Sequence, residues 1–146
     1  MSNSERNDLL YVCSLIEYIG RETNNHRSYV VSSIGYDGLK HLYDVASVNH
    51  NLSFQQVGNE VINDYKIEKG TFDTVSNCIF KVPSYISIGS VYKRLIMSLN
   101  SGDIINTLYK VFSSFLSDEI SNFDSDLYYQ NNSYLCACYY AGKILD

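Results

Sequence analysis

Hydrophobic residues recur every three or four positions through most of the chain, which is the spacing of amphipathic α-helices. The first such stripe runs from Leu9 to Ile19, where Val12, Cys13 and Ile16 share its helical face. Gly20 and the polar run that follows it predict the end of this helix. A second, short helix is expected over residues 28–34.

Gly35 bounds that short helix, and Asp37 is placed to cap the next one. The apolar face of this next helix carries Leu39, Leu42, Tyr43 and Ala46. Ser53 and Gln56 then have the spacing of a capping box, so a helix is predicted from Ser53 to Tyr65, with Gly70 ending the pattern.

Residues 71–82 lose the helical spacing and contain β-branched side chains. The only proline of the chain, Pro83, closes this stretch. We expect a loop here, or one short strand near Cys78 to Val82. The loop at 71–83 would divide a single domain of residues 1–146 into an N-terminal half, 1–70, and a C-terminal half, 84–146.

The second half begins with a predicted helix over residues 88–99, and Asp103 is placed to cap the following one. That helix has the broadest apolar stripe, from which we predict that Phe112 lies in the core; the stripe contains Ile104, Ile105, Leu108, Val111, Phe112, Phe115 and Leu116. A last helix is expected from Ser133 to Tyr140, with Gly142 at its C-terminal cap. The pattern predicts an all-α domain of six or seven helices.

The charge pattern argues against direct nucleic-acid binding. The net charge is −5, from 11 Lys and Arg against 16 Asp and Glu, whereas phosphate neutralisation needs a basic stripe. Beyond Ser113 the only cation is Lys143, so the C-terminal quarter is acidic. The apolar runs are far shorter than a membrane span of about 20 residues, and the polar N-terminus does not resemble a secretory signal. We expect a cytoplasmic protein without membrane contact.

Motifs for catalysis, metal binding and nucleotide binding are missing from the sequence, so we expect no enzyme activity, no metal and no cofactor. The pair Cys136 and Cys138 lacks the second pair of a zinc site, and all four cysteines are interpreted as reduced core residues. Asp124 and Asp126 begin like a calcium loop but lack its later ligands. One catalytic alternative stays open: Arg21 and His26 could act as phosphate clamp and base in a ribonuclease.

Tyrosine is the feature with most unexplained chemistry, because 14 of the 146 residues are Tyr. Neighbouring pairs cannot both point inward on a regular helix, so one ring of each pair should be exposed. Exposed Tyr beside acidic residues is typical of an interface for a basic protein partner. The predicted partner-binding residues are Asp124, Asp126, Tyr128, Tyr129, Tyr139 and Tyr140. The alternative is that an AT-rich genome inflates the Tyr content and that these rings only cover the rim of the core.

Several stretches of the first half resemble small helical proteins of Firmicutes encoded beside ADP-ribosyltransferase-like toxins in toxin–antitoxin-type loci. The stretches that carry this resemblance are Leu10–Ile19, Arg27–Val31, Gly38–Leu39, Val48–His50 and Val57–Ile62. The resemblance implies no catalytic residues. It implies a non-catalytic protein-interaction module with an antitoxin-like or accessory role. A phage or mobile-element inhibitor of a host defence protein is the second interpretation, and the ribonuclease is the third.

Overall fold

The computed structural model describes residues 1–146 and is all helical, as the sequence predicts. It has eight α-helices, not the six or seven expected, and one short 3₁₀ helix, η1. The helices are α1 (Asn3–Thr23), α2 (Arg27–Asp44), α3 (Ala46–Asn49), α4 (Phe54–Asp64), α5 (Tyr85–Leu99), α6 (Ile104–Ser113), α7 (Phe115–Ile120) and α8 (Asn132–Ala141), and η1 is Leu127–Tyr129. None of the helices is both long enough and apolar enough to cross a bilayer.

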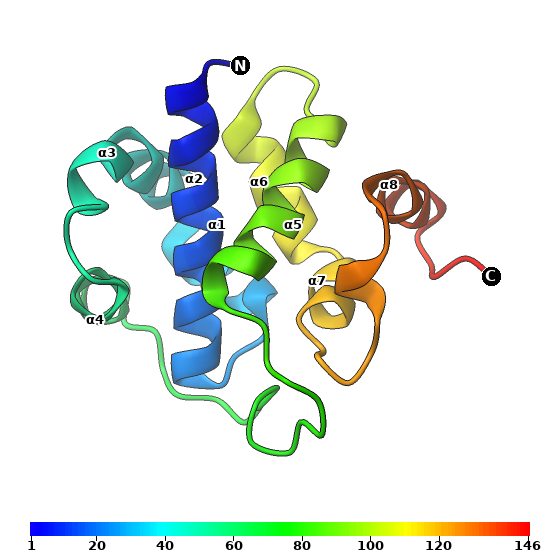
Figure 1. The fold of residues 1–146 in the computed structure, drawn as a ribbon. Coiled ribbons are helices and arrows are strands. Elements are labelled where there is room, and N and C mark those ends of the chain that lie inside the picture. Colours follow the sequence, from blue (N-terminus) through cyan, green and yellow to red (C-terminus); the bar gives the residue numbers. More distant parts are fainter.

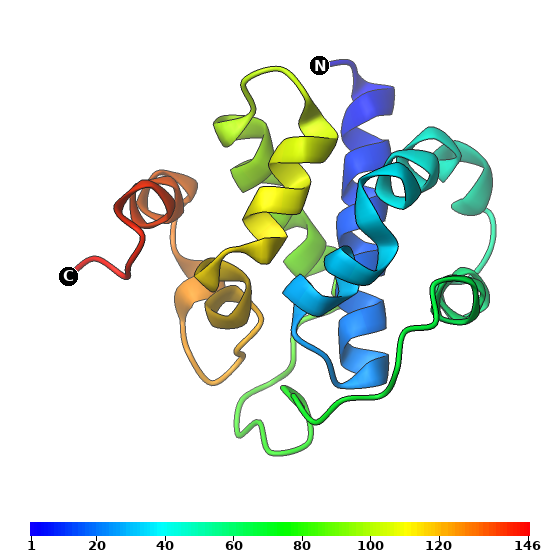
Figure 2. The same cartoon turned by 180° about the vertical axis from the view of Figure 1, so that it is seen from behind.

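Helix α1 is the centre of the fold, because α2, α3, α4 and α5 all pack against it (Figure 1). Seen from behind, α6 covers α2 and α5, whereas α7 and α8 lie at the opposite side from α4 (Figure 2). The two long connections, from α4 to α5 and from α7 to α8, both run along the lower edge of the molecule in these views. The first stripe is confirmed: Leu9, Val12, Cys13, Ile16 and Ile19 are completely buried.

Capping by side-chain oxygens explains most helix starts. The prediction that Ser53 begins a helix is confirmed, since its hydroxyl accepts a hydrogen bond from the Gln56 N–H at 3.0 Å. Asp103 likewise caps α6, and Gly142 ends α8 in the left-handed conformation, with φ of 72°. Asp37 makes no capping hydrogen bond, so that prediction is wrong. The break in α2 lies at Gly35, whose φ of 75° is favourable only for glycine.

Two further helix boundaries differ from the predictions. Helix α1 continues through Gly20 to Thr23. This glycine makes room for the side chain of Arg27, since a Cβ there would lie 2.5 Å from Arg27 Cδ. The long stripe after Asp103 is divided at Ser114, whose extended backbone separates α6 from α7. Phe115 is therefore 37% exposed instead of buried, whereas Phe112 is fully buried as predicted.

The stretch between α4 and α5 is a loop without a strand, so the option of a strand near Cys78 to Val82 is wrong. Residues 80–82 donate no backbone hydrogen bond within the chain, and only the Phe80 carbonyl accepts one, from the thiol of Cys78. All four cysteines are free thiols. Cys13 and Cys138 are buried as predicted, but Cys78 and Cys136 are only partly buried.

Candidate partner-binding site

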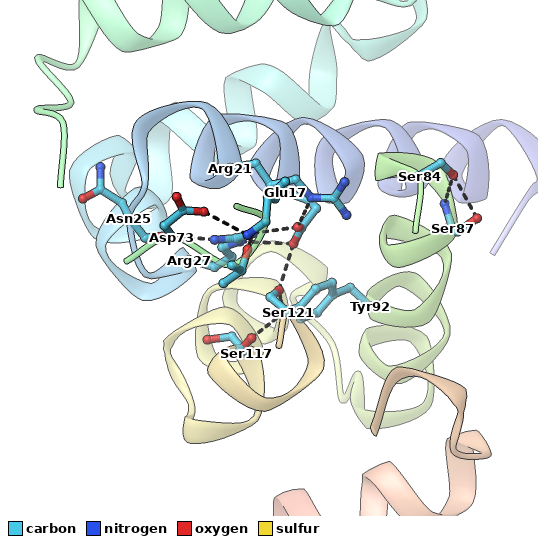
Figure 3. Close-up of polar contacts among 12 residues, drawn as sticks. Glu17, Arg21, Asn25, Arg27, Asp73, Ser84, Ser87, Tyr92, Ser117 and Ser121 are labelled. Atoms are coloured by element: carbon cyan, nitrogen blue, oxygen red, sulfur yellow. Dashed lines mark hydrogen bonds and ion pairs between the residues drawn. The ribbon is translucent and has the colours of Figure 1, made fainter. Parts of the chain in front are cut away.

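A cluster of buried charged and hydroxyl side chains connects α1, α2, α5 and the end of α7 (Figure 3). The carboxylate of Glu17, on α1, accepts two hydrogen bonds from the guanidinium of Arg27, on α2, at 3.1 and 2.7 Å. Both side chains are 0% exposed. Although burial opposes its ionisation, the Arg27 and Arg21 guanidinium groups hold the pKa of Glu17 below its ordinary value. The pair is therefore fully charged at neutral pH.

Hydroxyl groups of α5 and of the α7 end complete this cluster. Ser121 donates at 2.8 Å to Oε1 of Glu17, the oxygen that also accepts from Arg27 Nε. Tyr92 lies 2.8 Å from the Ser121 hydroxyl and donates to the Ser117 carbonyl. Burial, together with the charge of Glu17, raises the pKa of Tyr92. Because every one of these groups is buried, the cluster has no access for a substrate. Its effect is to fix the C-terminal end of α7 against α1.

The two residues of the ribonuclease hypothesis have separate partners in the structure. Arg21 donates to Glu17 at 2.7 Å, and its guanidinium is stacked between the rings of Tyr85 and Phe123, 4.6 Å from each centroid. Only 8% of the Arg21 side chain is exposed, so a phosphate group has little access to it.

His26, in contrast, lies at the surface. Its Nδ1 is 2.8 Å from an oxygen of Asp118, and its ring stacks on Phe72 at 3.9 Å. Neither contact involves Arg21. The geometry therefore does not favour a shared site of base and phosphate clamp.

A partly apolar hollow lies where the α4–α5 loop meets the segment between α7 and η1. It has a volume of about 540 Å³, and its walls include Phe80 and Lys81 on one side and Phe123, Asp126 and Tyr129 on the other. Phe123, which is buried, lines this hollow, and the guanidinium of Arg21 lies over its ring. Through Arg21, the charged cluster therefore contacts a side chain that lines this hollow.

Two further hollows adjoin the first one. On the acidic side, a hollow of about 360 Å³ shares Asp124 with it and is also lined by Asp73, Asp118 and Glu119. On the other side, a hollow of about 600 Å³ shares Lys81, Tyr128 and Tyr129 with it. We call the three together the partner groove. It follows the loop from Cys78 to Ser84, and Lys81 is the only cation among its lining residues.

The acidic residues of the partner groove have different local roles. Asp124 accepts a hydrogen bond from the backbone N–H of Ile79 at 3.1 Å, so it also joins the two walls. Hydrogen bonds from Ser76 and Val75 lower the pKa of Asp73 to about 2. The Glu119 carboxylate makes no hydrogen bond or ion pair within the chain, which leaves it open to a partner.

The structure separates the six predicted partner-binding residues into two groups. Asp124, Asp126, Tyr128 and Tyr129 all line the partner groove. Tyr139 and Tyr140 lie on α8 and do not line it. One ring of each pair is exposed, as predicted: Tyr129 is 77% and Tyr140 75% exposed, whereas Tyr128 and Tyr139 pack against the core. Burial and the neighbouring Tyr129 raise the pKa of Tyr128 to about 12.

Sequence reasoning missed the opposite wall of the groove. Phe80 lines this wall and is 59% exposed, and Ile79, which precedes it without lining the groove, is 82% exposed, although both are large apolar residues. The signal was present as two consecutive apolar residues in a loop that has no helical spacing. No three or more His, Cys, Asp or Glu residues lie in a position to hold a metal ion.

Comparisons of the chain with models of known families, with curated proteins and with solved structures gave no match.

Proposed function

We propose that this protein is a non-catalytic protein-interaction module, an antitoxin-like or accessory component of a bacterial toxin–antitoxin or mobile-element locus, that holds a basic protein partner in the partner groove. The observation that carries the proposal is the combination of exposed large apolar side chains with carboxylates around adjoining hollows. Phe80 and Tyr129 supply the apolar part, and the exposed Ile79 precedes Phe80 in the same loop. Such combinations mark binding surfaces, whereas single exposed apolar residues do not.

The acidic residues indicate the charge of the partner. Asp118, Glu119 and Asp126 line the groove, and Lys81 is the only Lys or Arg among its lining residues. Carboxylates at the rim of an interface raise the association rate with a cationic partner, and rings at the centre slow its dissociation. A basic surface is common to nucleic-acid-processing toxins and to host defence proteins that bind nucleic acid. The second candidate, an inhibitor of a host defence protein, would therefore use the same groove.

The test is a pair of matched tyrosine variants. Tyr129 lines the groove and Tyr140 does not, yet the two side chains are almost equally exposed, at 77% and 75%. The partner is co-purified from the native operon with the parent protein, and its binding to each variant is measured by surface plasmon resonance. We expect Tyr129→Ala to weaken binding by about 2 kcal/mol, mostly through faster dissociation, and Tyr140→Ala to bind like the parent.

Circular dichroism of both variants checks that they remain folded. The proposal is wrong about the site if Tyr129→Ala binds like the parent or if Tyr140→Ala loses as much affinity. The identity of the captured partner separates the two candidates: a toxin from the same locus supports the antitoxin-like role, and a host defence protein supports the inhibitor. RNA cleavage by the purified protein, abolished by His26→Ala, would instead support the ribonuclease.

A further inference from the structure

We propose that the partner groove binds a short, unfolded segment of the partner, in which cationic side chains lie next to one aromatic or branched aliphatic side chain. This inference rests on the proposed function and makes it more specific. It follows from the shape of the groove, from the order of charge along it and from the backbone of the loop that lines it.

The shape of the groove fits a single chain segment. The central hollow shares lining residues with each of the other two: Asp124 with the acidic hollow, and Lys81, Tyr128 and Tyr129 with the hollow on the other side. The resulting depression is continuous and follows one loop from Cys78 to Ser84. A continuous groove of this kind takes an extended peptide more readily than a flat protein surface.

The chemistry changes along the groove. The hollow beside α7 has carboxylates of Asp73, Asp118 and Glu119 on its walls, so it favours Lys or Arg side chains. The central hollow lies between the rings of Phe80 and Tyr129, so it favours an apolar anchor. A peptide that fills both needs cationic and apolar residues within a few positions of each other.

The backbone of the loop offers hydrogen bonds to such a segment. The N–H groups of Phe80, Lys81 and Val82 and the carbonyls of Lys81 and Val82 have no partner within the chain. Phe80 and Lys81 are also exposed. Unpaired backbone groups beside side-chain pockets are the arrangement by which proteins add an extended peptide to their own backbone.

The experiment uses the ¹⁵N-labelled full chain and three pools of capped ten-residue peptides. The first pool has two Arg residues followed by one Phe, Tyr, Leu or Ile, in a background of Ala, Ser and Gln. The second pool has Glu in place of Arg, and the third has Ser in place of the apolar residue. We expect the first pool to shift the amide signals of residues 80–82 and Tyr129 and to bind at least about tenfold more tightly than the other two.

Two variants locate the cationic end. Glu119 lines the acidic hollow and has no partner within the chain, whereas Glu22 is exposed on α1 and does not line the groove. Glu119→Gln should weaken binding of the first pool about two- to fivefold at low salt, and the difference should disappear in about 1 M salt. Glu22→Gln should bind like the parent.

The inference is overturned if the three pools bind equally, if the shifted amides lie outside the groove or if no pool binds. These failures are distinct from failure of the proposed function. Should Tyr129→Ala weaken the natural complex while no pool binds, the partner uses a folded surface, so only the peptide inference is lost. If a pool binds but Tyr129→Ala leaves the natural complex unchanged, the proposed site for that partner is wrong.

Discussion

Glu17→Gln removes the one negative charge of the buried cluster, and we expect it to be the most destabilising single-atom change in the protein. Glu17 and Arg27 are both 0% exposed, so the variant leaves the Arg27 guanidinium buried without a carboxylate. The amide keeps one oxygen acceptor, but its NH₂ group takes the place of an oxygen that accepts from buried donors, and an NH₂ group cannot accept from them. At Oε2 these donors are Arg27 Nη2 and Arg21 Nε, each at 2.7 Å, and at Oε1 they are Arg27 Nε and the Ser121 hydroxyl.

Breaking a buried ion pair by removal of one partner costs about 3–5 kcal/mol, and we expect a loss in this range. The measurement is urea denaturation at pH 7, with the midpoint compared at constant slope. Glu22→Gln, on the exposed face of the same helix, is the matched control and should stay within about 0.5 kcal/mol of the parent.

A double-mutant cycle tests the cause of the loss. Glu17→Leu leaves Arg27 buried without a carboxylate, and Arg27→Met leaves the buried Glu17 with Arg21 as its only cation. The double variant should therefore lose less than the sum of the two single losses, by about 1–3 kcal/mol. The reasoning is refuted if Glu17→Gln loses less than 1 kcal/mol, or if the two single losses simply add.

The remaining predictions concern pH and packing. Because its pKa is lowered in the folded state, Glu17 contributes stability that is complete above its ordinary pKa of 4.5 and is lost as the pH falls through its lower folded value. Urea denaturation between about pH 6 and pH 3 should therefore show a smaller loss for Glu17→Gln than for the parent; equal slopes would contradict this. Phe112→Ala removes a fully buried ring that stacks on Tyr92 at 4.1 Å and should cost about 3–5 kcal/mol of unfolding free energy in the same assay; a loss below 1 kcal/mol would contradict it. Gly20→Ala should cost about 1–3 kcal/mol, because the new methyl group meets Arg27 Cδ at 2.5 Å; unchanged stability would show that Arg27 moves freely.

Helices and their caps could be predicted because their signals are local. The stripe of α1 and the caps at Ser53 and Asp103 depend on residues within a few positions of one another. The break at Ser114 could not be predicted, since the apolar spacing continues on both sides of it while the backbone turns. Gly20 was misinterpreted for a related reason: a glycine that ends one helix and a glycine that admits a distant side chain look identical in sequence.

Half of the candidate site was visible in the sequence. The acidic and Tyr-rich wall, from Asp124 to Tyr129, is contiguous in the chain and was found by its composition. The opposite wall lies in the loop with Ile79 and Phe80, where no spacing rule tells an exposed side chain from a buried one. Helical phase predicts that one Tyr of a pair is exposed, but only the tertiary structure shows that Tyr129 faces a groove and Tyr140 does not.

The passage of Arg27 across α1 at Gly20 ties the identity of three positions together over two helices. A larger residue at position 20 blocks the arginine, and loss of Glu17 strands it, so evolution can change these positions only jointly or in a permitted order. Surface positions are free of that constraint and diverge first. Distant descendants of this fold should therefore be recognisable by a glutamate, a glycine three residues later and an arginine seven residues after that, when the rest of the sequence has drifted.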